Sequence, residues 1–209
     1  HERIVQCILG RKRNQKLAEF ATCLHATGAR PGELLMATAT DWNDRLGALV
    51  YYADDRRLEG EARHKTAGKG KDRRIFFTGE ALTIMRALVK KHPKGPLWRT
   101  RRGTPWNRTN MNASFQVVGE RLGIEGLTPY SYRHTYATRW LEKGGSIDDL
   151  AALLGNTPAM IRKHYSHICD NVDRLRDLAE KFTATPTPEG RSETPSPAVL
   201  PFASGKEAV

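Results

Sequence analysis

The residues with the clearest chemical potential lie near the C-terminal end of the chain. Arg133 and His134 stand near the start of one predicted helix, and Tyr165 follows a later helical run. The planar guanidinium of an arginine can hold two oxygens of one phosphate. An activated tyrosine hydroxyl can attack phosphorus and form a covalent intermediate. The combination indicates covalent chemistry on a phosphate ester, whereas Tyr165 taken alone could be a packed core aromatic.

A second arginine that could bind a phosphate lies in the stretch TGARPGEL at residues 27–34. Arg30 precedes Pro31, which disfavours helical geometry at Arg30 and places it at a corner between two predicted helices. The N–H groups at the start of the second helix favour an anion there. Glu33 is close enough in sequence to orient the guanidinium. The alternative for Arg30 is an ordinary surface arginine in a turn.

A predicted β-hairpin carries three lysines near its tip, Lys65, Lys69 and Lys71, around the turn at residues 67–72. A lysine held beside a phosphate can act as a general acid when surrounding positive charge lowers its pKa. The alternative is a solvated basic turn that touches the backbone of a nucleic acid. Composition does not separate the two interpretations.

Tyr130 lies three residues before Arg133, so both side chains occupy one face of the predicted helix. His134 is one turn beyond Tyr130 and can reach the same region. The alternative for Tyr130 is core packing, and for Arg133 it is an ion pair on the helix surface.

Asn156 precedes Thr157 and Pro158 at the start of another predicted helix. Either Asn156 or Thr157 can cap that helix, which would explain Asn156 without any role in a site. His164 and His167 have the spacing of a metal-binding pair, but no Cys, Asp or Glu nearby completes a ligand set. We therefore expect no metal site.

The elements that must position these residues follow from hydrophobic spacing and from Gly, Pro and capping residues. We expect helices at residues 15–27, from 31, and at 79–91, 109–122, 129–143 (capped by Thr128), 147–154, 158–165 and 171–182. We expect strands at residues 46–53, 61–66 and 73–78. The fold class is therefore α+β, mainly α with a small antiparallel β-sheet.

The bulk composition indicates a polyanionic partner. The chain has 209 residues and a formal net charge of +11, which favours nucleic acid first and an acidic membrane surface second. From residue 184 the chain becomes rich in Pro and Gly and carries more acidic than basic residues, so the positive charge belongs to the part before it. Three sparse cysteines are typical of free thiols in a reducing compartment. Basic side chains expected to contact DNA are Lys69, Lys71, Arg73, Arg101, Arg102, Arg162 and Lys163.

Taken together, the motifs resemble the catalytic domain of tyrosine recombinases, the phage-type integrases. The matching stretches are TGARPGEL at 27–34, HKTAGKGKDRRIFF at 64–77, TPYSYRHTYAT at 128–138, LLGN at 153–156 and HYSH at 164–167. Their order and spacing fit over roughly residues 14–182. The resemblance implies a catalytic domain at residues 1–183, with no room for the family's N-terminal core-binding domain before Gln15. Residues 184–209 are expected to form a Pro-rich flexible tail.

The resemblance also implies roles for individual residues. Arg30 and Arg133 would grip the scissile phosphate, and Tyr165 would attack it to form a 3′-phosphotyrosyl link to DNA. Lys65 would be the general acid for the leaving 5′-hydroxyl, with Lys69 as the alternative. No cofactor or metal is implied, because two guanidinium groups can stabilise the charge that a metal neutralises elsewhere.

Two positions depart from the family pattern. Tyr130 stands where the family commonly has His, and Asn156 where it has His or Trp. Both can donate a hydrogen bond to phosphate, but neither shuttles protons near neutral pH as a histidine does. Glu33 would support Arg30, and His134 could supply the missing base if the geometry allows.

The expected function is site-specific DNA recombination or integration, with double-stranded DNA as partner and self-association into a tetramer on paired sites. The expected location is the prokaryotic cytoplasm or nucleoid, with no membrane partner. One alternative is a catalytically impaired DNA-binding protein of the same fold. Another is a topoisomerase-like or resolvase enzyme that uses the same chemistry.

Overall fold

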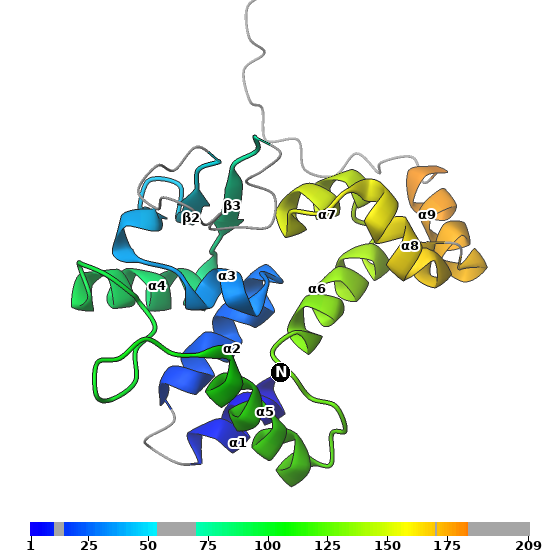
Figure 1. Ribbon diagram of the computed structural model, residues 1–209. Coiled ribbons are helices and arrows are strands. Elements are labelled where there is room, and N and C mark those ends of the chain that lie inside the picture. The colour runs from blue at the N-terminus through cyan, green and yellow to red at the C-terminus, as the bar shows by residue number, and fades with distance from the viewer. Residues whose placement is uncertain (11–14, 54–69, 170, 184–209) are drawn as a thin grey trace, which may run out of the picture.

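The computed structural model describes residues 1–10, 15–53, 70–169 and 171–183. Within these residues the chain is mainly helical with one small sheet (Figure 1). The helices are α1 (Glu2–Leu9), α2 (Gln15–Thr27), α3 (Pro31–Leu35), the 3-10 helix η2 (Ala39–Asp41), α4 (Gly79–Lys91), α5 (Arg108–Leu122), α6 (Ser131–Glu142), α7 (Ile147–Leu154), α8 (Pro158–Cys169) and α9 (Val172–Thr183). The strands are β1 (Trp42–Asn43), β2 (Ala48–Tyr51) and β3 (Arg73–Phe76). Among the described helices, none has the length and apolar character to cross a membrane. The predicted α+β class is confirmed.

The three strands form an antiparallel sheet in the order β1-β2-β3, with Leu49 opposite Ile75. All four residues of β2 are buried, as expected for a central strand. Side chains of β3 alternate, so Arg73 and Ile75 face inward while Arg74 and Phe76 face outward. The alternation places a charged side chain, Arg73, in the interior.

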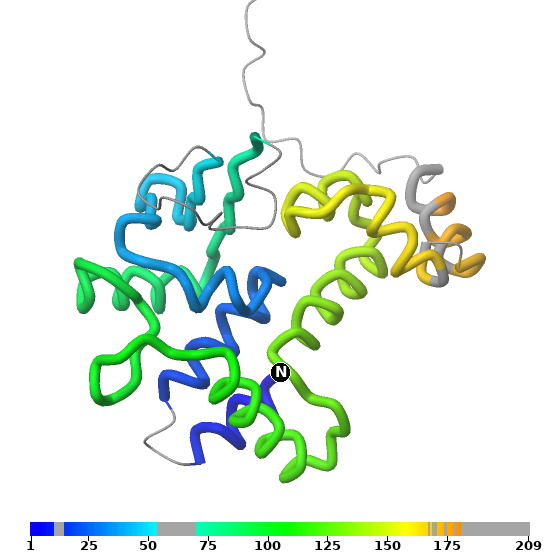
Figure 2. Tube along the Cα trace, in the orientation of Figure 1, coloured from blue at the N-terminus to red at the C-terminus, as the bar shows by residue number. Residues whose placement is uncertain are grey.

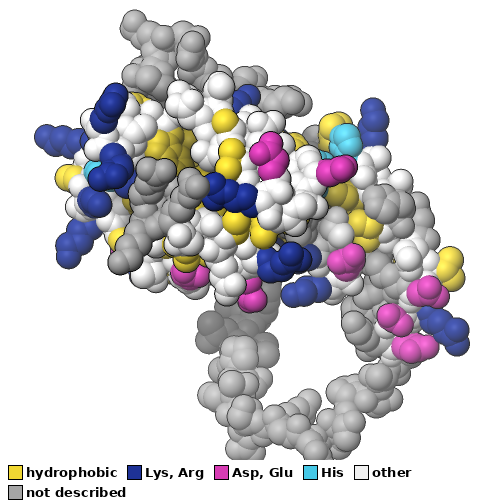
Figure 3. Space-filling view, turned by 90° about the horizontal axis from the view of Figure 1, so that it is seen from below, with side chains coloured by type: hydrophobic (Ala, Val, Ile, Leu, Met, Phe, Trp, Pro, Cys, Tyr) yellow, Lys and Arg dark blue, Asp and Glu magenta, His cyan; other side chains and the backbone are white. Residues whose placement is uncertain are grey.

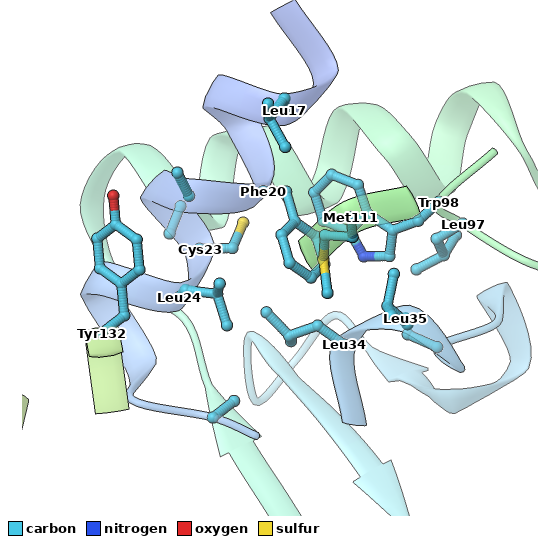
Figure 4. Packing of buried hydrophobic residues seen from close by; sticks show 14 of the residues in the cluster. Leu17, Phe20, Cys23, Leu24, Leu34, Leu35, Leu97, Trp98, Met111 and Tyr132 are labelled. Carbon is cyan, nitrogen blue, oxygen red and sulfur yellow. The ribbon is translucent and has the colours of Figure 1, made fainter. Parts of the chain in front are cut away.

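The larger hydrophobic cluster is built around α2. Phe20 and Leu24 of this helix are fully buried, and the Phe20 ring meets the Trp98 ring edge to face, with centroids 4.9 Å apart. Figure 4 shows these side chains converging with Leu34 of α3 and with residues from α5 and α6. The packing fixes α3, and therefore the corner at Arg30, against a rigid support.

A smaller hydrophobic cluster joins the second half of α6 to α7 and α8. Its fully buried members include Leu141, Leu150 and Ile161, and the ring of Tyr165 packs against them. Helix α6 belongs to both clusters, since Tyr132 near its start is part of the larger one. Figure 2 shows α6 running between the two groups of elements. The predicted site residues come from both sides of this junction.

The predicted element bounds hold best where a local signal ends the helix. The helices at 15–27, 79–91 and 147–154 are confirmed at both ends. Helix α6 begins at Ser131, so the predicted start at Pro129 is wrong, and Thr128 does not cap it. The Thr128 N–H instead donates to Ser131 Oγ, and Tyr130 occupies the cap position without a side-chain cap.

The remaining differences concern short elements. The strand expected at 46–53 is shorter, and α1 and β1 were not predicted. Helix α8 continues beyond Tyr165, but the backbone leaves helical geometry at that residue, with φ −130° and ψ 21°. The strand at 61–66, residues 67–69 of the hairpin turn and the tail from residue 184 lie outside the described residues.

Candidate active site

Arg30 sits at the N-cap of α3, where Pro31 occupies the first turn. Its Nη1 donates to Glu33 Oε1 at 2.8 Å. Its Nη2 donates to the Gly155 carbonyl at 3.0 Å and to Asn156 Oδ1 at 2.7 Å. These hydrogen bonds use three of the five guanidinium N–H groups and aim the side chain across the junction between the two hydrophobic clusters.

Glu33 is the acidic centre of the site and is only 4% exposed. Oε2 accepts from the Arg30 backbone N–H at 3.0 Å, which closes the first turn of α3. Arg73 Nε and Nη2 donate to the two carboxylate oxygens at 3.2 and 3.3 Å. Burial acts to raise the pKa of Glu33, but Arg73 and Arg30 outweigh it and hold the pKa below its ordinary value. The carboxylate is therefore ionised and shared by two arginines.

Arg133 is only 2% exposed and reaches across the same junction from α6. Nη1 donates to the Gly28 carbonyl at 3.0 Å, and Nη2 donates to the Leu154 carbonyl at 2.9 Å. Burial, followed by the nearby charge of Arg30, lowers the pKa of Arg133 to about 10. The guanidinium remains charged at neutral pH and is poised to attract an anion.

Helix α6 can pack close to the turn between α2 and α3 because of Gly28, which follows α2 at a φ of +60°. A Cβ atom at this position would lie 2.7 Å from Cγ of Tyr136. Only glycine meets both demands, because the conformation disfavours side chains and the space is already filled. Gly28 thereby lets its own carbonyl meet Arg133.

The C-terminal end of α7 collects the three guanidinium groups, and we call Arg30, Arg73 and Arg133 the arginine cluster. The three acceptors are the successive carbonyls of Leu153, Leu154 and Gly155. A helix C-terminus leaves such carbonyls without intrahelical donors and carries partial negative charge. Glu33 accepts hydrogen bonds from Arg30 and Arg73, whereas Arg133 donates to the carbonyls of Gly28 and Leu154. Among the described residues, the hydrogen bonds of the three positive groups thus include one carboxylate in total. The site therefore has an excess of positive charge that suits a phosphodiester.

Tyr165 presents its hydroxyl to His134, with 2.9 Å between Tyr165 Oη and His134 Nδ1. Burial raises the pKa of Tyr165, and the Arg133 charge opposes this only in part. Partial desolvation, followed by the charges of Arg133 and His164, lowers the pKa of His134. At neutral pH the phenol therefore keeps its proton and the imidazole is neutral, which is the pairing of a nucleophile with a base.

Tyr130 and Asn156, the two departures from the family pattern, occupy different surroundings. Tyr130 is exposed, and its ring meets the His134 ring at a centroid distance of 5.2 Å. Asn156 uses its side-chain oxygen to accept from Arg30. Thr157 Oγ1, and not Asn156, accepts from the Met160 N–H at the start of α8. Asn156 is thus bound into the arginine cluster.

The model of the phage integrase family matches residues 2–171 of this chain. The chain belongs to the phage integrase family. Its relatives include the tyrosine recombinase XerD of Halalkalibacterium halodurans, 25% identical over 180 residues that cover 81% of this chain and 54% of the relative. The XerD of Corynebacterium glutamicum is 30% identical over 175 residues, 79% of this chain and 51% of the relative. The chain spans about half the length of the curated relatives it matches.

Solved structures share the fold of this chain. The Tn1549 transposon integrase, in complex with a circular intermediate DNA, has a TM-score of 0.70 at 21% identity, covering 86% of this chain and 63% of that one. The catalytic domain of bacteriophage HP1 integrase has a TM-score of 0.56 at 22% identity, covering 88% of this chain and 93% of that one. The helical architecture with its small sheet is thus that of known integrase catalytic domains.

The structure brings most of the predicted catalytic side chains together in two linked groups. The first group is Arg30, Glu33, Arg133 and Asn156, joined around the end of α7. The second is Tyr165 with His134, which lie close enough to Arg133 for its charge to act on both. The predicted lysines Lys65 and Lys69 lie outside the described residues.

Among the side chains predicted to contact DNA, Arg73 is the one that the structure corrects. It is 2% exposed, and four of its five guanidinium N–H groups already donate to Glu33 and to the Arg74 and Leu153 carbonyls, so it is not available as a surface contact to DNA. Arg133 is equally buried but makes two hydrogen bonds, both to backbone carbonyls, which leaves N–H groups for a phosphate. The period-two pattern of β3, with Ile75 and Phe77 also inward, is the signal that could have revealed this. The exposed members of the predicted set are Lys71, Arg101, Arg102, Arg162 and Lys163.

One face of the molecule, seen from below, shows how the surface charge is arranged. Lys and Arg side chains project from several parts of this face, and acidic side chains lie among them (Figure 3). No continuous basic patch covers the described residues visible on this face.

The described residues contain no group of three or more His, Cys, Asp or Glu side chains that could hold a metal ion.

Proposed function

We propose that this integrase cleaves and rejoins DNA strands through a 3′-phosphotyrosyl intermediate on Tyr165, as a site-specific recombinase. The observation that carries the proposal is the Tyr165–His134 hydrogen bond beside an arginine cluster that has one carboxylate for three positive groups. The names of the relatives, tyrosine recombinases, and the DNA bound in the Tn1549 integrase structures support it.

In the cleavage step, Tyr165 Oη attacks the phosphorus while His134 Nδ1 accepts the phenolic proton. The bond from phosphorus to the 5′-oxygen breaks, and the DNA 3′-phosphate stays linked to the tyrosine. Arg30 and Arg133 stabilise the negative charge that gathers on the non-bridging oxygens. A hairpin lysine, Lys65 or alternatively Lys69, gives a proton to the leaving 5′-oxygen. Rejoining is the reverse, with a 5′-hydroxyl as attacking group.

The substrate on this proposal is double-stranded DNA, held mainly through phosphate contacts from the exposed basic side chains. Recombination joins two sites, so we propose self-association into a tetramer on paired DNA. We further propose that residues 1–183 form the catalytic domain, that 184–209 form a tail, and that the protein acts in the prokaryotic cytoplasm or nucleoid.

A trapping experiment tests the function. The chain is incubated with a pool of nicked duplexes that have randomised sequences around the nick, so that cleavage releases a short strand and blocks rejoining. We expect a covalent protein–DNA adduct that survives denaturing electrophoresis and disappears in Tyr165→Phe. Tyr52→Phe, which alters an exposed tyrosine outside the site, is the control and keeps the adduct.

The contrary result is salt-sensitive DNA binding without any adduct in the unaltered chain. That outcome would replace the proposal with the catalytically impaired DNA-binding protein. Relaxation of supercoiled DNA without recombinant products would instead favour the topoisomerase-like alternative.

A further inference from the structure

Arg73 is a buried arginine to which the mechanism above gives no task. It opens β3, yet its side chain turns into the junction between the two hydrophobic clusters. It makes four hydrogen bonds: two to Glu33, one to the Arg74 carbonyl at 2.7 Å and one to the Leu153 carbonyl at 2.7 Å. A buried guanidinium is stable only when specific partners accept its hydrogen bonds, and here four of its five N–H groups have such partners.

Both partners of Arg73 outside its own strand also hold Arg30. Glu33 Oε1 accepts from Arg30 Nη1 at 2.8 Å and from Arg73 Nε at 3.2 Å. The end of α7 gives its Leu153 carbonyl to Arg73 and its Gly155 carbonyl to Arg30. The contacts therefore form a closed ring from Arg73 through the carboxylate to Arg30, then through α7 back to Arg73.

The stem of Arg73 lies close against the end of α7. A Cβ atom on Gly155 would lie 2.9 Å from both Cδ and Nε of Arg73, so the arginine stem passes directly over the glycine backbone. Asp72, the preceding residue, accepts from the Ala53 N–H at 3.2 Å and ties the start of β3 to the end of β2. The stem is thus confined while its head bonds to Glu33 and α7.

We propose that Arg73 is a positioning residue for Arg30: it fixes the Glu33 carboxylate and the end of α7 so that the Arg30 guanidinium meets the scissile phosphate in one orientation. Arg73 itself does not touch DNA. The inference rests on the proposed function and assigns it an additional residue. Without Arg73, the carboxylate keeps Arg30 as its partner but loses the two hydrogen bonds that hold it against α7.

The test compares Arg73→Gln and Arg73→Lys in the full chain by the rate of adduct formation on a nicked duplex at saturating DNA. Gln removes the charge, and Lys keeps it but cannot span Glu33 and Leu153 together. Displacement of a phosphate-binding group by about 1 Å costs about 100-fold in rate, and we expect a loss of this order with DNA affinity within about threefold of the unaltered chain. Arg86→Gln breaks the exposed Arg86–Asp44 ion pair instead and serves as the matched control with an unchanged rate.

A second substrate separates positioning from a loss of folded protein. In a duplex with a methylphosphonate at the scissile position, one non-bridging oxygen is replaced by a neutral methyl group. The transition state then carries less negative charge for Arg30 to stabilise. We expect the deficit of both Arg73 variants to shrink to about threefold on this substrate. If Arg73→Gln does not fold, the comparison of Arg73→Lys with the unaltered chain provides the test.

Three results would overturn the assignment. Equal rates for the Arg73→Lys variant and the unaltered chain on the phosphodiester would show that Arg30 needs no such support. An equal deficit on both substrates would show a general structural role. Absence of adduct from the unaltered chain would instead reject the proposed function, and the role of Arg73 with it.

Discussion

Tyr165 and His134 show how a site can be complete although two expected histidines are replaced. The phenol is kept protonated by burial, and a neutral imidazole lies 2.9 Å from its oxygen. His134 immediately follows Arg133 on α6, so one helix carries both the proposed phosphate-binding arginine and the proposed base. Neither Tyr130 nor Asn156 has to accept the proton of the nucleophile.

The pH dependence of cleavage tests His134 as the base. Its pKa is lowered, so the neutral, proton-accepting form persists below the ordinary imidazole value of about 6.5. We expect the rate of adduct formation to stay constant from about pH 8 down to about pH 6.5 and to fall only below about pH 6.5. His134→Gln should lose about 100-fold in rate and lose this acidic fall as well. A variant that retains the fall would assign the titration to another group.

The linkage between Glu33 and the arginines predicts acid sensitivity of the fold. The pKa of Glu33 is depressed in the folded state, so its stabilisation is present above the unfolded value of about 4.3 and is lost as the pH falls through the folded pKa. Glu33→Gln should lower the free energy of unfolding at pH 7 by about 3 kcal/mol, because it leaves Arg73 buried without its partner. Urea unfolding at pH 7 and at pH 3 measures both effects. A variant as stable as the parent at pH 7 would contradict the ion-pair account.

At the residue scale, motifs identify the side chains that we propose meet the phosphate but not those that support them. Arg30, Arg133 and Tyr165 stand in stretches whose types and spacing already indicate phosphate chemistry. Arg73 stands among lysines and arginines of a basic turn, and composition alone assigns all of these to the surface. Its burial depends on the side to which β3 turns, which is a consequence of pairing with β2.

At the element scale, the ends of α7 and α8 place the reactive groups. The C-terminus of α7 presents carbonyls to the arginine cluster, and Gly155 ends the helix at a φ of +63°. Helix α8 departs from helical geometry at Tyr165 itself. The helix ends marked by Gly123 and Gly155 could be predicted, because their causes are local, whereas Pro129 did not mark the start of α6. The short α1 and β1 could not, because α1 is held by packing on α2 and α5, and β1 by pairing with β2.

Replacement of Gly155 by Ala tests the end of α7. The positive φ disfavours any side chain by about 1–2 kcal/mol, and the new methyl group would also collide with Arg73. Gly123→Ala is the matched control, since Gly123 ends α5 at a φ of +65° with no atom within 4 Å of the added Cβ. We expect both variants to lose stability in thermal unfolding but only Gly155→Ala to slow adduct formation. Equal rates in the two variants would separate the end of α7 from catalysis.

At the scale of the whole molecule, the site lies where two hydrophobic clusters meet. Arg30, Arg73 and Arg133 each bond from the side of the larger cluster to the end of α7 in the smaller one. These hydrogen bonds fix the position of the smaller cluster against the larger one and keep positive charge concentrated between them. Hydrophobic spacing predicts the helices that build each cluster, but the junction arises only when distant segments pack.

The net charge of +11 predicts a steep salt dependence of DNA binding. Replacement of the exposed Arg101 or Arg102 by Gln should each reduce the slope of log affinity against log salt by about 1, if that side chain contacts a phosphate. Arg73→Gln should leave the slope unchanged because Arg73 is buried. Affinities measured at several salt concentrations decide this. A slope reduced by Arg73→Gln would place that side chain on DNA after all.

The most direct test of the central claim is the chemical identity of the covalent link. The adduct formed on nicked DNA is digested with protease and nuclease, and the nucleotide-bearing peptide is sequenced by mass spectrometry. The account predicts a nucleotide joined through its 3′-phosphate to the oxygen of Tyr165. A link to any other residue, or through a 5′-phosphate, would contradict it.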